Sequence, residues 1–115
     1  MRRAALITGG GTGIGAAVAR LLAADGWHVG LVGRRAEPLE AVAAETGGTA
    51  FPGDAANLAH LAAAVTALGG VHALVCSAGA GRSGTAIEQT QDGFEDVLRT
   101  NLTAPFLAAK ACLPS

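Results

Sequence analysis

The sequence is poor in aromatic and charged residues. It contains no tyrosine, three phenylalanines and one tryptophan, and charged residues fill only 15% of its 115 positions. Its formal net charge is −1, with 8 basic and 9 acidic residues and no basic run. A surface that binds nucleic acid or an anionic membrane needs a concentration of positive charge. We therefore expect neither partner.

Long hydrophobic runs and clustered metal ligands are missing too. After the first three residues only four apolar residues precede Thr8, too few for a signal peptide, and no apolar segment approaches membrane-spanning length. Cys76 and Cys112 form no CxxC or Cys/His cluster, and the three histidines are scattered. We interpret both cysteines as reduced, small apolar residues. These absences predict a cytoplasmic protein with no metal site.

Half of the residues are hydrophobic, and they form short β-type runs that alternate with longer runs of helical period. This alternation is typical of a parallel α/β sheet, and the length suits one domain over residues 1–115. Asn57 is a good helix N-cap, Pro38 suits the first turn of a helix, and glycine pairs at 47–48 and 69–70 end two helices. The expected strands span residues 4–8, 28–32, 49–51 and 71–76.

The connections predict how these strands are ordered. Because parallel crossovers are almost always right-handed, three strands wind outward and the fourth lies on the other side of the first. The result is a Rossmann-like, doubly wound α/β sheet of order 3-2-1-4, truncated before any later strands. Ligands bind such sheets where the order reverses. Two glycine-bearing loops flank that point, TGGGTGIG at 8–15 and CSAGAG at 76–81.

The first of these loops predicts a dinucleotide site. A glycine-rich turn between a strand and a helix lets backbone N–H groups approach a diphosphate at the positive end of the helix. The plainer interpretation is a tight turn without a ligand. A P-loop would need a lysine within the motif, but the only lysine is Lys110, and no GxSxG nucleophile motif occurs.

Arginines at the end of the second strand favour one dinucleotide. An NAD site usually has an acidic residue there for the ribose hydroxyls, whereas arginine accommodates a 2′-phosphate. The sequence has Arg34 and Arg35 after Gly33 and no acid until Glu37. We therefore expect NADP(H) in preference to NAD(H), with a solvated surface pair of arginines as the alternative.

These motifs resemble those of the short-chain dehydrogenase/reductase family. Thr8-Gly9 with Gly13 and Gly15 is similar to its TGxxxGxG turn, Asp54 to its adenine-contacting aspartate, and Cys76-Ser77-Ala78-Gly79 lies where NNAG is usual. The departure at 76–77 weakens any expectation about side-chain contacts there. The residues expected to contact the cofactor are Thr8, Gly9, Gly11, Thr12, Gly13, Ile14, Gly15, Gly33, Arg34, Arg35, Asp54, Ala55, Ser77, Ala78 and Gly79.

Asn101 is the expected catalytic residue. Phe94, Val97, Leu98 and Asn101 follow helical spacing, so the amide should lie on an apolar stripe that faces the sheet. A core asparagine whose hydrogen bonds are satisfied, or one that bends the helix, would have the same spacing. The resemblance implies instead that Asn101 holds a water in the proton relay, although Ala104 replaces the family's usual glycine.

The family's Ser and YxxxK motif have no counterpart in these residues. Phe106 stands where a tyrosine would have to precede Lys110. The resemblance therefore implies the NADP(H)-binding half of an oxidoreductase that acts on a small carbonyl or alcohol substrate, either a fragment or a truncated gene product. The alternative is a non-catalytic dinucleotide-binding module or degenerate remnant. Members of the family commonly associate through the helices that start near Phe94 and Pro105. The resemblance therefore implies that the full-length protein is a homo-oligomer.

Overall fold

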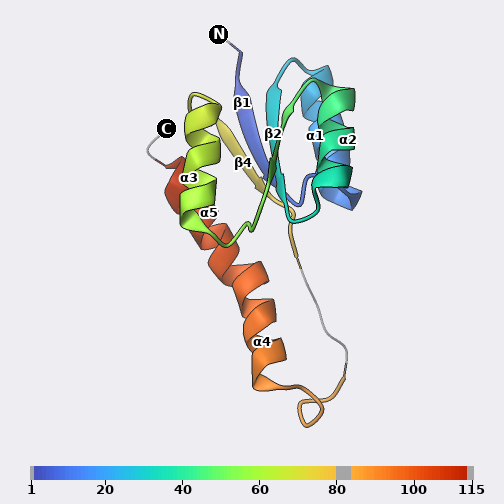
Figure 1. Ribbon diagram of the computed structural model, residues 1–115, viewed down its shortest axis with the longest axis vertical. Coiled ribbons are helices and arrows are strands. Elements are labelled where there is room, and N and C mark those ends of the chain that lie inside the picture. Colours follow the sequence, from blue (N-terminus) through green and yellow to red (C-terminus); the bar gives the residue numbers. More distant parts are fainter. Residues whose placement is uncertain (1, 80–83, 114–115) are drawn as a thin grey trace.

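The computed structural model describes residues 2–79 and 84–113, so the end of the second glycine loop, at 80 and 81, lies outside the described residues. Strands and helices alternate along the chain until the fourth strand, and the described elements that follow it are all helical (Figure 1). The elements are β1 (Ala4–Thr8), α1 (Gly13–Ala24), β2 (His28–Gly33), α2 (Ala36–Thr46), β3 (Thr49–Pro52), α3 (Leu58–Ala67), β4 (Ala73–Cys76), α4 (Gln91–Leu98), the π-helix η1 (Arg99–Thr103) and α5 (Ala104–Cys112).

The four strands form one parallel sheet in the order β3-β2-β1-β4, which confirms the predicted topology. Three strands begin at the expected residue, but β4 begins at Ala73 and not at 71. Before β4, the His72 N–H already donates to the Ala4 carbonyl at 2.8 Å, and the Ala4 N–H donates to His72 Nδ1 at 3.1 Å. The side chain therefore takes part in the first link between β1 and β4.

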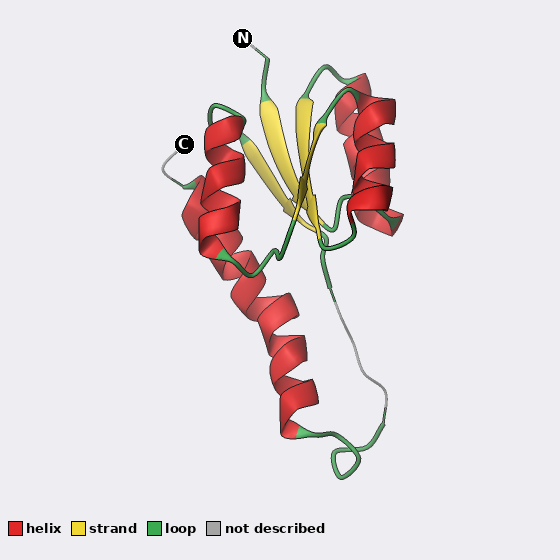
Figure 2. Cartoon of the chain, viewed as in Figure 1, coloured by secondary structure: helices red, strands yellow, loops and turns green. Residues whose placement is uncertain are grey.

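Helices cover both faces of the sheet, as Figure 2 shows: α1 and α2 lie on one side, and α3 and α5 lie on the other. Because neighbouring side chains on a strand point to opposite faces, β1 contributes to both layers. Leu6 packs with Leu61 of α3, whereas Ile7 packs with Leu39 of α2, and all four side chains are fully or almost fully buried. Burying each such side chain contributes about 1.5–3 kcal/mol.

Local signals begin and end the helices largely as expected. The Asn57 carboxamide oxygen accepts from the His60 N–H at 3.0 Å, which caps α3. Gly47 follows α2 in a left-handed conformation with φ +69°, and Pro38 lies in the first turn of that helix. Thr90 caps α4 by accepting from the Gly93 N–H at 3.0 Å. These caps fix where each helix meets the loops at the edge of the sheet.

The helix α4 leaves the body of the molecule beyond the edge where the strands end (Figure 1). It runs into η1 and α5, and α5 returns to pack beside α3. The expected packing of its apolar stripe against the sheet is wrong, because α4 extends past the sheet. Phe94 is 59% exposed, and Leu98 is exposed too.

Candidate functional site

A cavity of about 500 Å³ lies at the carboxyl edge of the sheet, where the strand order reverses. That volume is within the range of small-molecule and cofactor sites. Loops after all four strands contribute to its wall, together with Thr100 of η1 and Ala104 of α5. Every residue expected to contact the cofactor lines this cavity except Thr8 and Gly15; the other lining residues are Pro38, Leu39, Gly53, Ala56, Thr100 and Ala104.

Thr8 and Gly15 lie behind the wall and hold the first loop in place. Thr8 is buried, and its hydroxyl oxygen accepts from the Ala78 N–H at 3.4 Å, which joins the loop after β1 to the loop after β4. Gly15 is buried in the first turn of α1. A Cβ there would overlap the Gly9 carbonyl oxygen. Both residues therefore act on the site through the backbone that they position.

The glycines of the first loop differ in what a side chain at each position would contact. Gly9 has φ +67°, and a Cβ on it would stand only 2.7 Å from the Ala78 nitrogen. A Cβ on Gly11 would stand 3.0 Å from the Leu39 nitrogen at the start of α2. Gly13 is different, because its φ is +54° and no atom from other parts of the described chain lies within 4 Å of a Cβ built there. At Gly9 and Gly11, the missing side chain therefore makes room for other parts of this chain. Gly13 instead borders open space in the cavity.

The start of α1 offers unpaired polar groups to that space. Thr12 is the N-cap residue, but its side chain makes no capping hydrogen bond among the described residues. The first N–H groups of a helix lack partners within the helix and carry partial positive charge. Gly13 and Ile14, which begin this helix, line the cavity. The arrangement suits an anionic group.

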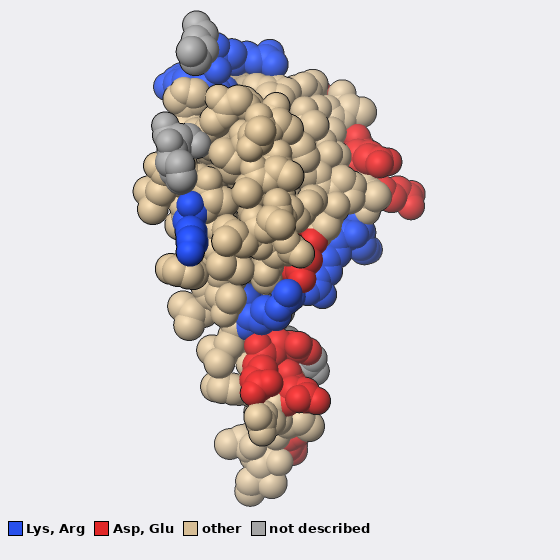
Figure 3. All heavy atoms as spheres, turned by 60° about the vertical axis from the view of Figure 1, so that its left-hand side comes forward, with Lys and Arg blue, Asp and Glu red and all other residues tan. Residues whose placement is uncertain are grey.

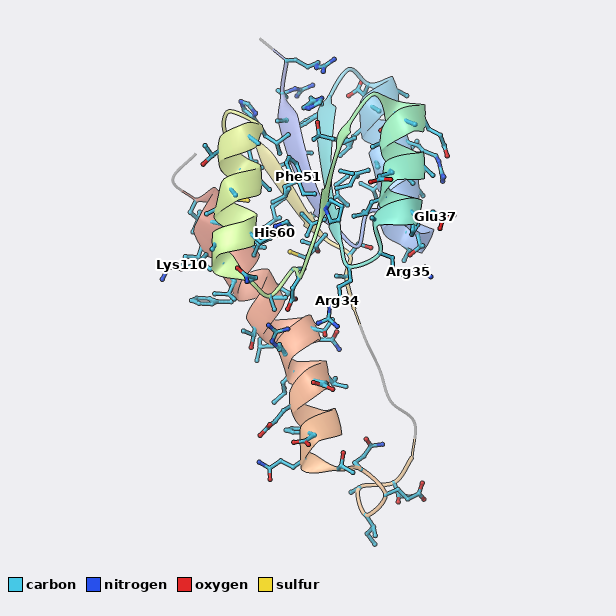
Figure 4. All side chains as sticks on the ribbon, in the orientation of Figure 1. Arg34, Arg35, Glu37, Phe51, His60 and Lys110 are labelled. Carbon is cyan, nitrogen blue, oxygen red and sulfur yellow. The ribbon has the colours of Figure 1, made fainter. Side chains whose placement is uncertain are left out.

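Asp54 lies between two arginines at the other end of the cavity. Its Oδ2 atom is 2.6 Å from Nη1 of Arg99, and its Oδ1 atom is 3.7 Å from Nη2 of Arg34. The Ala56 N–H donates to Oδ1 at 2.8 Å. Figure 3 shows basic side chains around an acidic patch, above the acidic surface of α4. In Figure 4, Arg34 points down from the end of β2, and Arg35 lies beside the start of α2.

The carboxylate form of Asp54 is stabilised by this setting. Partial burial raises the pKa of Asp54, but the Ala56 hydrogen bond, the hydrogen bond and charge of Arg99, and the charge of Arg34 outweigh that effect. The net result is a pKa below the ordinary value of an aspartate. Asp54 is therefore negatively charged at neutral pH.

A histidine supports the third loop. His60 of α3 places Nε2 3.1 Å from the carbonyl oxygen of Phe51 in β3, and the two residues lie close together in Figure 4. A Cβ on Gly53 would stand 2.5 Å from the same nitrogen, so only glycine leaves room for the ring. This contact fixes the loop that carries Asp54. His60 has a structural role here that its scattered sequence position did not reveal.

Asn101 lies in the middle of η1, and its side chain is exposed and not buried on a stripe facing the sheet. The expectation of a buried amide is wrong because α4 passes the edge of the sheet and because the π-helix changes the helical period. The side chain still approaches the site: its Oδ1 atom lies 3.6 Å from the position of a Cβ on Gly79. Single-turn π-helices are frequent at functional sites.

Arg99 is the functional candidate that the sequence analysis missed. It lies 45 positions from Asp54, and no motif connects the two residues. Their contact depends on how α4 and η1 return to the sheet. Leu39 also lines the cavity, from α2. Its apolar character and helical spacing in the sequence indicate only a core residue.

Other features of the described residues add no second site. Both cysteines are free, and burial raises the pKa of the Cys76 and Cys112 thiols, which favours their protonated form. Within residues 2–79 and 84–113, no group of His, Cys, Asp or Glu side chains could hold a metal ion. No helix in the same ranges has the length and apolar character needed to cross a membrane.

Comparison with known proteins identifies relatives of the whole chain. The model of the short chain dehydrogenase family matches residues 3–115. Nodulation protein G of Rhizobium sp. (strain N33) is 42% identical over 110 residues, which cover 90% of this chain and 45% of that protein. A short-chain dehydrogenase structure from Streptomyces avermitilis matches with a TM-score of 0.90 at 29% identity, covering 99% of this chain and 44% of that one.

A second similar structure is a complex with a nicotinamide dinucleotide. It is a blue fluorescent protein from a metagenomic library in complex with NADPH, and it matches with a TM-score of 0.88 at 34% identity. The match covers 98% of this chain and 51% of that one. The chain spans about half the length of the relatives it matches.

Proposed function

This chain belongs to the short-chain dehydrogenase family, and on that premise we propose that residues 1–115 form a domain that binds NADP(H) for an oxidoreductase. When bound, a nicotinamide cofactor supplies or accepts hydride, here exchanged with a small carbonyl or alcohol substrate. The observation that carries the proposal is the cavity itself. It joins the uncapped start of α1 to an arginine at the end of β2.

The residues at hand fit the diphosphate of such a cofactor. At Gly13 a side chain would occupy space that the chain leaves open, and the first N–H groups of α1 begin there. Backbone N–H groups at a helix start bind phosphate oxygens well. Gly9, Gly11, Thr12 and Ile14 line the same region and would hold the diphosphate against the helix.

The adenosine end would lie beside Arg34. This side chain is 70% exposed, and its distance to the Asp54 carboxylate, 3.7 Å, is beyond hydrogen-bonding range. Its planar guanidinium remains charged at any working pH and suits phosphate oxygens. We assign recognition of the 2′-phosphate mainly to Arg34, with Arg35 in support and Gly33, Asp54 and Ala55 forming the surrounding wall.

The nicotinamide end would lie toward the loop after β4. Ser77, Ala78 and Gly79 line the cavity there, and Asn101 faces Gly79 from η1. We propose that the Asn101 carboxamide holds a water molecule in a proton relay. Its exposure and its place in a π-helix support this role better than a role in the core.

The proton donor of the reaction would come from outside these 115 residues. The chain has no tyrosine, and Lys110 lies on the side of α5 away from Arg34 (Figure 4). General acid–base catalysis is typically worth about 10²–10⁴-fold in rate. We propose that residues 1–115 alone bind the cofactor but do not turn it over.

We also propose that the full-length protein is a homo-oligomer that pairs through α4 and α5. Phe94, Leu98, Leu102 and Phe106 follow one another at four-residue spacing, and all four are exposed. Such a contiguous apolar stripe is typical of a surface that another protein covers. Sedimentation of the natural polypeptide as a monomer at micromolar concentration would contradict this assignment.

Replacing Arg34 tests the assigned cofactor. Charge-assisted hydrogen bonds contribute about 1.5–3 kcal/mol each, so Arg34→Ala should weaken NADP⁺ binding about ten- to a hundredfold and leave NAD⁺ binding nearly unchanged. Arg20→Ala is the matched control, because Arg20 pairs with Glu45 on the outer surface of α1 and α2 at 2.8 Å. An unchanged ratio of the two affinities in Arg34→Ala would show that Arg34 is only a solvated surface residue.

A further inference from the structure

We propose that Arg99 is a specificity-determining residue, which favours NADP(H) by neutralising Asp54 and so keeping Arg34 available for the 2′-phosphate. The inference rests on the proposed function, because it assumes that Arg34 meets this phosphate. Arg99 does not line the cavity and would not touch the cofactor. It is a positioning residue that acts through Asp54.

The contacts of Asp54 are unequal, and the inequality favours Arg99. The Arg99 guanidinium donates to Oδ2 at 2.6 Å, and the Ala56 N–H donates to Oδ1 at 2.8 Å. Each carboxylate oxygen therefore has a close donor without Arg34. The Arg34 Nη2 atom lies 3.7 Å from Oδ1, so this third contact is electrostatic and not a hydrogen bond. Because Asp54 is already paired, Arg34 can turn toward a ligand at little cost.

Without Arg99, the same carboxylate would oppose the ligand in two ways. First, Arg34 would become its principal cation and would be held back from the cavity. Second, its negative charge would repel the 2′-phosphate. A phosphate oxygen bonded to Arg34 would lie about 3 Å from the guanidinium. Asp54 would then be close to the phosphate, well within the Debye length of about 8–10 Å at physiological salt.

The size of the repulsion can be stated as a change in affinity. At about 7 Å in the dielectric of water, a pair of unit charges changes an equilibrium constant about threefold. A phosphate monoester carries roughly 1.5–2 negative charges at neutral pH. Removing Arg99 should therefore lower the preference for NADP⁺ over NAD⁺ roughly three- to tenfold. NAD⁺ has no 2′-phosphate, so its affinity should change little.

The fold explains why an arginine in this position reaches Asp54. Arg99 is the first residue of η1, and Asn101 faces Gly79 from the middle of the same short element. η1 therefore approaches lining residues from both ends of the cavity, with Arg99 bonded to Asp54 and Asn101 close to Gly79 in the loop after β4. A change in the helical register of η1 would disturb both contacts.

The test measures dissociation constants of NADP⁺ and NAD⁺ on the natural polypeptide that carries this sequence, at one fixed ionic strength. We expect Arg99→Ala to lower the ratio of NADP⁺ to NAD⁺ affinity three- to tenfold and Arg99→Lys to lower it less. Arg20→Ala, another exposed arginine paired with a carboxylate, should leave the ratio unchanged. The double variant Arg99→Ala with Asp54→Asn should return the ratio toward that of the wild type, because the uncompensated charge is then gone.

Three outcomes would overturn the inference. The ratio could stay unchanged in Arg99→Ala, both affinities could fall equally, as a merely structural role would cause, or Asp54→Asn could fail to restore the ratio. A wild-type protein without preference for NADP⁺ would instead contradict the proposed function. The two failures are therefore distinguishable. If Arg99→Ala does not fold, a comparison of Arg99→Gln with Arg99→Lys decides the question through the same ratio.

Discussion

Gly15 offers a direct test of how the first loop is held together. In an ordinary helix, replacing glycine by alanine stabilises the protein by up to about 1 kcal/mol. Here a Cβ on Gly15 would overlap the Gly9 carbonyl oxygen and stand 2.8 Å from the Gly9 carbonyl carbon. Contacts below 3.0 Å essentially never occur at real Cβ atoms, so the backbone must move. Gly15→Ala should therefore destabilise the protein despite its better helix propensity.

The expected loss follows from the two opposing effects. Overpacking of a close contact costs about 1–3 kcal/mol, and the gain in helix propensity offsets at most about 1 kcal/mol of it. We expect a net loss of about 1–2 kcal/mol in the free energy of unfolding. Urea denaturation measures this as a lower midpoint with an unchanged m-value. NADP⁺ affinity should fall about tenfold or more, because the displaced backbone continues into Gly13 and Ile14.

Gly26→Ala is the matched control. Gly26 has φ +88° and open space around it, so alanine there costs about 1–2 kcal/mol of backbone strain without disturbing the cavity. This variant should lose comparable stability and keep its NADP⁺ affinity. If Gly15→Ala were as stable as the wild type, or bound NADP⁺ as the wild type does, the contact with the Gly9 carbonyl would not hold the loop in place.

Three further predictions concern stability. Leu61→Ala should lower the free energy of unfolding by about 2–5 kcal/mol in denaturant titrations, because the Leu61 side chain is fully buried in the core cluster on the α3 side of the sheet. Asn57→Ala should lower it by about 1 kcal/mol by removing the cap of α3, whereas Asn57→Asp should retain the cap and most of the stability. The pKa of the Asp54 carboxyl is lowered in the folded protein. Its contribution to the free energy of unfolding is therefore present above the ordinary carboxyl pKa of about 4 and is lost as the pH falls through the folded pKa. The difference in stability between wild type and Asp54→Asn should therefore shrink below about pH 4, and a difference independent of pH would contradict the lowered pKa.

The topology could be predicted because it depends on local signals and general rules. Glycines, Asn57 and the alternation of short and long apolar runs mark the elements, and the handedness of crossovers then orders the strands. The start of β4 was misjudged by two residues because Val71 and His72 read as part of an apolar run. Only the structure shows that the His72 side chain accepts from the backbone of β1.

The site was predicted less completely than the fold. Loop residues such as Gly9 and Gly13 could be found because a turn into a helix needs glycine at fixed spacing. The direction in which α4 leaves the sheet is a tertiary property, and the helical period of Phe94 and Leu98 indicates only that they share a face. For the same reason, no pattern in the sequence connected Arg99 to Asp54.

We propose above that the cavity at the sheet edge binds NADP(H) in preference to NAD(H). Its most direct test is a paired titration of the wild-type polypeptide with NADPH and NADH at the same ionic strength, followed through the fluorescence of the reduced nicotinamide. We expect a dissociation constant for NADPH about ten- to a hundredfold below that for NADH. Equal dissociation constants, or tighter binding of NADH, would contradict it.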